Sequence, residues 1–139
     1  QILAIMKSVM GHPIVQVEDF YDPVAWPPYA NCDIVGFDPY VPKPTLDIAR
    51  FNQYVTTPVN NLRLFTTKPI MLVGQAFWQP GHPMWDPPPP VEQLEWSYEL
   101  AKNVGAIGLA WFAVDPTDPV EGILERPDFQ AKVLSFHSR

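Results

Sequence analysis

The stretch Lys68-Pro-Ile-Met-Leu-Val-Gly-Gln75 decides the fold of this chain. Its interior is continuously apolar rather than alternating, which is typical of a parallel strand that is covered on both faces. Three other short runs, at residues 13–17, 33–38 and 106–113, have the same character. Four such strands, separated by segments with helical signals, predict an α/β fold with parallel pairing and right-handed crossovers.

Helical signals lie between these runs and at both ends of the chain. Residues 91–103 carry one apolar stripe with charged residues elsewhere, follow a run of prolines and stop before Gly105. A similar stripe predicts a second helix over residues 45–55. Residues 2–10 have the pattern of the end of a helix, and residues 127–136 have the pattern of a closing helix. The predicted order is therefore a repeated alternation of strand and helix.

Two architectures fit this order: an open doubly wound sheet and half of an eight-stranded barrel. No predicted strand leads into a G-x-G-x-x-G sequence or a P-loop, so the nucleotide-binding version of the open sheet is disfavoured. We therefore expect the C-terminal half of a (β/α)₈ barrel, with four parallel strands and their helices. Residues 1–139 are expected to form one unit that is a piece of a larger barrel domain, because the chain opens at Gln1 within a helical pattern.

Composition excludes several classes of protein. The net charge is −6, and the 9 Lys and Arg residues are scattered over 139 positions, which argues against a nucleic-acid partner. A lone cysteine, Cys32, permits no internal disulfide, lacks the partners for a zinc site and is expected to be a small buried residue. The sequence predicts no metal site and no cofactor. No apolar run is long enough to predict a membrane span.

The 18 prolines gather between the apolar segments, which indicates loops. The densest group, residues 87–90, predicts a short stiff polyproline II segment. A rigid loop that leads into the following helix is favoured about threefold over a proline-rich ligand for a partner domain.

Three of the apolar segments predicted to be strands together resemble a known family. They are Asp33-Ile-Val-Gly-Phe-Asp-Pro-Tyr40, the run from Lys68 to Phe77, and Gly105-Ala-Ile-Gly-Leu-Ala-Trp-Phe112, the last preceded by the Pro-Val-Glu-Gln-Leu helix. In this order they resemble strands six, seven and eight of glycoside-hydrolase-like TIM barrels related to clan A, over roughly residues 12–113. By this resemblance residues 13–17 would be strand five, and the chain would act on or bind a glycan.

The resemblance places the chemistry at the carboxyl ends of the strands. It would put the nucleophile at the end of strand seven, where this chain has Gln75, and the acid on strand four, which lies outside this chain. An amide can donate hydrogen bonds to sugar hydroxyls but cannot attack as a carboxylate does. The candidate substrate-binding residues at these strand ends are Asp19, Tyr40, Gln75, Trp78 and Trp111.

Glu18 and Asp38 are the candidate catalytic carboxylates. Gln16 and Glu18 fall on one face of their strand, which favours an inward Glu18. The likeness between residues 12–17 and 68–73 aligns Asp19 with Gln75 and favours the opposite, so both possibilities stay open. For Asp38, a catalytic role and a turn-forming role before Pro39 are about equally supported.

Aromatic residues in the loops after the strands add support for sugar binding, because flat apolar faces can stack on sugar rings. About half of them are expected merely to pack the proline-rich loops, and Trp96 is expected in the core. His82 is about three times better explained as a loop residue than as a proton carrier.

Two hypotheses about function follow. The first is a carbohydrate-active enzyme that uses Glu18 or Asp38, and the second is a noncatalytic barrel for glycan binding or assembly. Because half a barrel exposes strand edges, the chain is expected to bind its own N-terminal half, another subunit or a second copy. The glycan hypothesis also suggests an extracellular or cell-envelope location.

Overall fold

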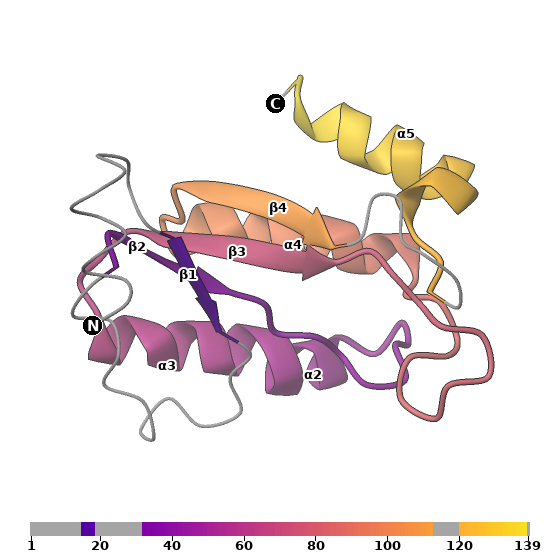
Figure 1. The fold of residues 1–139 in the computed structure, drawn as a ribbon, viewed down its shortest axis with the longest axis horizontal. Helices are drawn as coiled ribbons and strands as arrows, with labels where there is room; N and C mark the ends of the chain where they lie inside the picture. Colours follow the sequence, from indigo (N-terminus) through magenta and orange to yellow (C-terminus); the bar gives the residue numbers. More distant parts are fainter. Residues whose placement is uncertain (1–14, 19–31, 113–119, 139) are drawn as a thin grey trace.

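In the computed structural model, residues 15–18, 32–112 and 120–138 are described, the first of these ranges by its backbone only. The described strands form one sheet in the order β1-β2-β3-β4. Every neighbouring pair is parallel, so the predicted parallel pairing is confirmed (Figure 1). The strands are β1 (Val15–Glu18), β2 (Ile34–Phe37), β3 (Ile70–Gln75) and β4 (Gly108–Phe112).

Parallel pairing brings the carboxyl ends of the strands to one edge of the sheet. Glu18 is the register partner of Phe37, and Gln75 is the register partner of Phe112. The loops that leave β2 and β3 therefore start beside each other, although 34 positions in sequence separate Val41 from Gln75.

The helices within the described residues follow the predicted alternation. They are α2 (Ile48–Phe51), the π-helical turn η3 (Asn52–Thr56), α3 (Thr57–Phe65), α4 (Val91–Asn103), the 3₁₀ turn η4 (Ile123–Glu125) and α5 (Pro127–Phe136). The bounds of α4 and α5 are those predicted, and α4 begins directly after the proline run. The helix predicted over residues 2–10 lies outside the described residues.

The helix predicted over residues 45–55 is longer than expected, because the chain continues without a break from α2 through η3 into α3. Pro58 has no N–H and cannot make the ordinary bond to the carbonyl four residues earlier. The preceding turn widens instead, and the N–H of Thr57 bonds to the carbonyl of Asn52, five residues back. A π-helical turn thus lets the helix pass a proline that looked like its end.

The main core lies between one face of the sheet and the helices. Val35 and Phe37 of β2 and Ile70 and Leu72 of β3 are almost fully buried there. Because side chains alternate along a strand, these four residues define a single face, which we call the helix face. It packs against Phe51, Val55, Val59, Leu62, Leu100 and Ala101 from α2, η3, α3 and α4. Cys32 is buried in this core, as predicted, and Trp96 packs against it.

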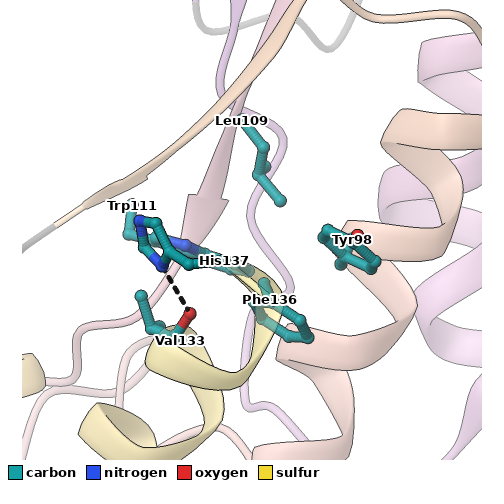
Figure 2. Close-up of a pocket in the computed structure, with 6 residues that line it drawn as sticks. All are labelled: Tyr98, Leu109, Trp111, Val133, Phe136 and His137. Atoms are coloured by element: carbon teal, nitrogen blue, oxygen red, sulfur yellow. Dashed lines mark hydrogen bonds between the residues drawn. The ribbon is translucent and has the colours of Figure 1, made fainter. Parts of the chain in front are cut away.

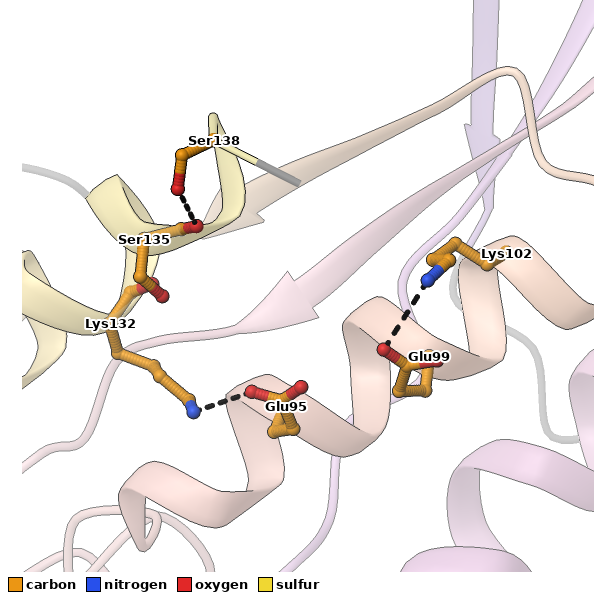
Figure 3. Close-up of polar contacts among 6 residues, drawn as sticks. All are labelled: Glu95, Glu99, Lys102, Lys132, Ser135 and Ser138. Atoms are coloured by element: carbon orange, nitrogen blue, oxygen red, sulfur yellow. Dashed lines mark hydrogen bonds and ion pairs between the residues drawn. The ribbon is translucent and has the colours of Figure 1, made fainter.

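Helix α5 packs on α4 and on the end of β4. The rings of Tyr98 and Phe136 stack with centroids 4.4 Å apart, and Lys132 forms an ion pair with Glu95 at 2.5 Å (Figure 3). A second, smaller core lies beneath α5 and contains Ala76, Trp78, Leu94, Ile123 and Phe129. This core ties the loop after β3 to the C-terminal segment.

The prediction of half a (β/α)₈ barrel with four barrel strands is wrong. The packed sheet of the described residues consists of three parallel strands, β2, β3 and β4, with helices, and β1 adds only four residues paired through the backbone. The clusters of buried residues place helices against the helix face. A continuous apolar run indicates that a strand is buried, but it does not indicate whether the sheet closes into a barrel. Over the residues that the structure describes, the chain is a small α/β unit.

Candidate functional site at the carboxyl edge of the sheet

The face of the sheet opposite the helices, which we call the open face, presents polar and aromatic side chains at the carboxyl edge. Gln75 lies three and five positions after the buried Leu72 and Ile70, so alternation directs it to the open face. Asp38 directly follows Phe37, which lies on the helix face, so alternation places Asp38 on the open face with Gln75. Phe112, the next residue after the helix-face Trp111, completes this set on β4.

Gln75 is held in one orientation. Its side chain is 6% exposed, and its Oε1 atom accepts a hydrogen bond of 2.9 Å from the backbone N–H of Val41. This bond fixes which end of the amide carries the NH₂ group. The Nε2 atom is buried, and no described residue offers it an acceptor within hydrogen-bonding distance. A buried donor without an acceptor costs about 1–3 kcal/mol, so a ligand oxygen that reached it after a small shift of the side chains that cover it would recover that free energy.

Four aromatic rings pack together beside Gln75: Tyr40, Phe77, Trp85 and Phe112. We call them the aromatic cluster. Their centroids lie 5.1 to 6.2 Å apart, mostly with the edge of one ring against the face of another. Tyr40 and Phe112 are closer to parallel, at 24°. Phe112 is 48% exposed, so the cluster offers an apolar ring to solvent at the rim of the sheet.

Hydrogen bonds and a ring contact hold the part of the loop between β3 and α4 that contains Trp85. The N–H of Gln79 donates to the carbonyl of Trp85, and the N–H of Gly81 donates to the carboxylate of Asp86. His82 stacks on Trp85 at 6.2 Å, and its Nδ1 atom accepts a hydrogen bond from the N–H of Met84. Trp85 is therefore positioned before any ligand arrives.

No protein family, curated protein or solved structure matches this chain. Within the described residues, no group of three or more His, Cys, Asp or Glu side chains could hold a metal ion. Among the same residues, no helix has the length and apolar character that a membrane crossing requires.

The structure brings three of the predicted site residues, Asp38, Tyr40 and Gln75, to one edge on the open face. Glu18 also ends its strand at this edge, but only its backbone is described. Asp19 lies outside the described residues. Trp78 is 7% exposed and belongs to the core beneath α5, where it contacts Phe129 at 6.3 Å.

Trp111 lies on the helix face, away from the aromatic cluster. Its ring stacks on Phe136 of α5 at 5.9 Å, and its six-membered ring lies over Gly74. Figure 2 shows Trp111 in a shallow groove of about 210 Å³ with Leu109, Tyr98, Val133, Phe136 and His137. A second groove, of about 290 Å³, lies between Trp111, Ile123 and α5. Trp78 and Trp111 thus belong to the packing of α5.

Three aromatic members of the site, Phe77, Trp85 and Phe112, are absent from the predicted set. One signal in the sequence could have identified Phe112. Adjacent residues of a strand point to opposite faces, so Trp111 and Phe112 cannot both face the same ligand. Trp85 is one of the loop aromatic residues whose position after a strand suggested sugar stacking. No comparable signal exists for Phe77.

Proposed function

We propose that the open face at the carboxyl edge of this sheet binds a carbohydrate. The observation that carries the proposal is the buried Nε2 donor of Gln75 beside a solvent-facing aromatic ring, Phe112. Sugars combine hydroxyl oxygens, which accept such a hydrogen bond, with apolar ring faces that stack on aromatic side chains.

The arrangement favours binding over hydrolysis. Cleavage of a glycosidic bond ordinarily needs two carboxyl groups, about 5 to 9.5 Å apart. Among the described side chains, Asp38 is the one carboxylate that strand alternation places on this part of the open face. Gln75 ends the neighbouring strand β3, and its amide is already bonded to Val41. An amide in that place can orient a sugar hydroxyl but cannot act as a nucleophile.

Binding to soluble glucans, mannans, xylans and galactans, measured by affinity electrophoresis and by calorimetry, tests the proposal. The chain is expected to bind at least one of these polymers, and Phe112→Ala is expected to weaken that binding about tenfold or more. Phe65→Ala is the matched control, because Phe65 is 51% exposed at the end of α3 and lies outside the aromatic cluster. Failure to bind any glycan, or equal losses in the two variants, would contradict the proposal.

Hydrolysis is a second candidate function, supported by the position of Asp38 directly after β2 at the carboxyl edge of the sheet. A carboxylate at the end of a buried strand is placed where acid or base catalysis occurs in many α/β proteins. Asp38→Asn keeps the size of the side chain and removes its ability to transfer a proton. If the chain releases reducing sugar from a bound polymer and Asp38→Asn abolishes this release, the site is catalytic. If binding persists and no sugar is released by the unaltered chain, the site only binds.

A further inference from the structure

We infer that β4 pairs edge to edge with β4 of a second copy of this chain, so that two sheets join into one. Within the part of the chain that the structure describes, β4 ends the sheet and pairs with β3 alone. Strands β2 and β3 contain fully buried residues such as Val35 and Ile70, whereas every residue of β4 keeps part of its surface exposed. Phe112 at its end is 48% exposed, and Ile107 just before it is 59% exposed. Such exposure is expected of an apolar strand at the edge of a sheet.

Over its described length, β4 carries no charge, no proline and no bulge, which are the features that ordinarily keep a sheet edge from pairing. In the sequence, residues 103–114 contain neither a charged residue nor a proline. The register of β4 with β3 runs without interruption from Gly108 to Phe112. The chain has a net charge of −6, and an uncharged edge lets two copies approach despite that charge.

The backbone groups of β4 that face away from β3 are arranged so that a second copy can bond to them. The carbonyl of Phe112 accepts a hydrogen bond of 2.6 Å from the N–H of Ala76, so the peptide groups of Phe112 face β3. Because these groups alternate along a strand, those of Leu109 and Trp111 face away from β3. In an antiparallel pair centred on Ala110, Leu109 of one copy lies opposite Trp111 of the other, and the two residues exchange both N–H···O bonds. The two-fold axis of such a dimer repeats this pair on the other side of Ala110.

The side chains are complementary in the same register. Gly108 of one copy lies opposite Phe112 of the other on the open face, and glycine leaves room for the aromatic ring, a pairing that shields a strand glycine from water. On the helix face, Leu109 of the second copy lies beside Trp111, and the grooves of about 210 and 290 Å³ that border Trp111 give its ring space to adjust (Figure 2). Because β4 itself supplies both members of each pair, a second copy is the occupant that this edge favours.

Sedimentation velocity of the whole chain tests the inference. Because an edge contact of this size is at the low end of specific interfaces, we expect a dissociation constant of about 10–100 µM. The chain should therefore convert from monomer to dimer as its concentration rises from low micromolar to millimolar. A monomer throughout, or assemblies that grow beyond a dimer, would overturn the inference. Pairing at the edge extends the sheet sideways, so this inference does not depend on carbohydrate binding.

Ala110→Lys and Ala110→Glu locate the contact. Ala110 is partly exposed, and each variant would place two like charges opposite each other at the two-fold axis. The Cα atoms of such a pair are about 4.5 Å apart, so each variant alone is expected to weaken self-association about tenfold or more. An equal mixture of the two variants brings opposite charges together and is expected to restore a dimer with one chain of each kind, which native mass spectrometry detects.

Ala49→Lys is the matched control, because Ala49 is exposed on α2 and the same charge is added away from the edge. It is expected to leave the dimer unchanged, and circular dichroism shows whether each variant folds. If both Ala110 variants fold and their mixture stays monomeric, or if Ala49→Lys weakens the dimer equally, the pairing of β4 with its copy is wrong.

Discussion

The substitution Gly74→Ala probes the division of the sheet into a helix face and an open face. A Cβ atom added at Gly74 would lie 2.4 Å from Cζ3 and 2.6 Å from Cε3 of Trp111. Ordinary carbon contacts are about 3.5–4.0 Å. Either the indole or the strand must therefore move, and the cost arises only if Trp111 lies on the helix face over Gly74.

The change in the free energy of unfolding for Gly74→Ala is the balance of two opposing effects. Overpacking a packed site costs about 1–3 kcal/mol, and replacing glycine by alanine recovers about 0.4–1 kcal/mol by restricting the unfolded chain. The grooves on both sides of Trp111 give the indole space to shift, which places the cost at the lower end of that range. We expect a net loss of about 0.5–1 kcal/mol, or roughly 2–5 °C in Tm for a chain of this length.

Gly108→Ala is the matched control, because Gly108 is also a strand glycine and the nearest atom to its added Cβ is Met71 Cγ at 3.7 Å. Urea unfolding followed by circular dichroism should show no loss of stability for this variant. In a Trp111→Leu background, Gly74→Ala should cost at least about 1 kcal/mol less than it does in the unaltered chain, which a double-mutant cycle measures. Equal effects of the two glycine substitutions, or no coupling to Trp111, would refute the assignment of faces.

Three further predictions concern stability. Phe129→Ala should cost about 3–5 kcal/mol in urea unfolding because Phe129 is fully buried, whereas Phe65→Ala, at a half-exposed position, should cost less than about 1 kcal/mol. The hydrogen bond from Arg126 lowers the pKa of Asp128, so this pair stabilises the fold above the unfolded pKa near 4 and the contribution is lost as the pH falls below it. Since the Asp128 side chain is nearly half exposed, Asp128→Asn should flatten the acid side of a stability profile by less than about 0.5 kcal/mol. Arg63→Lys should cost about 1–3 kcal/mol in thermal unfolding, because one ammonium group cannot replace the guanidinium that bonds three backbone carbonyls from two segments.

The elements that the sequence predicts correctly are those with a strong local signal. Helix α4 follows four prolines and carries an apolar stripe, and both its ends lie where the pattern places them. The strand at residues 69–75 was identified from its apolar interior, and β3 covers nearly all of it. The helix predicted over residues 45–55 followed an apolar stripe that ends at Val55, and the π-helical turn that carries the chain past Pro58 into α3 has no such signal in the sequence.

Which side chains share the candidate site depends on which face of a strand each of them occupies. Gln75, Asp38 and Tyr40 follow strand ends, and parallel pairing alone places them near one edge. Trp78 and Trp111 also follow or end strands, but their rings pack against α5 and the core beneath it. The apolar runs could not indicate this, because continuous hydrophobicity is the same on both faces.

The geometry also limits how tightly a sugar can bind. The aromatic cluster is packed ring against ring, and the loop hydrogen bonds hold Trp85, so little side-chain freedom is lost when a ligand arrives. Against this advantage, only about half of Phe112 is exposed, and the buried polar contact rests on a single donor from Gln75. One stacking contact and one such hydrogen bond together supply only a few kcal/mol, which corresponds to dissociation constants near 1 mM, at about −4 kcal/mol. Polymers that present many copies of the same sugar should therefore bind much more visibly than a monosaccharide, and a search with monosaccharides at micromolar concentration would miss the site.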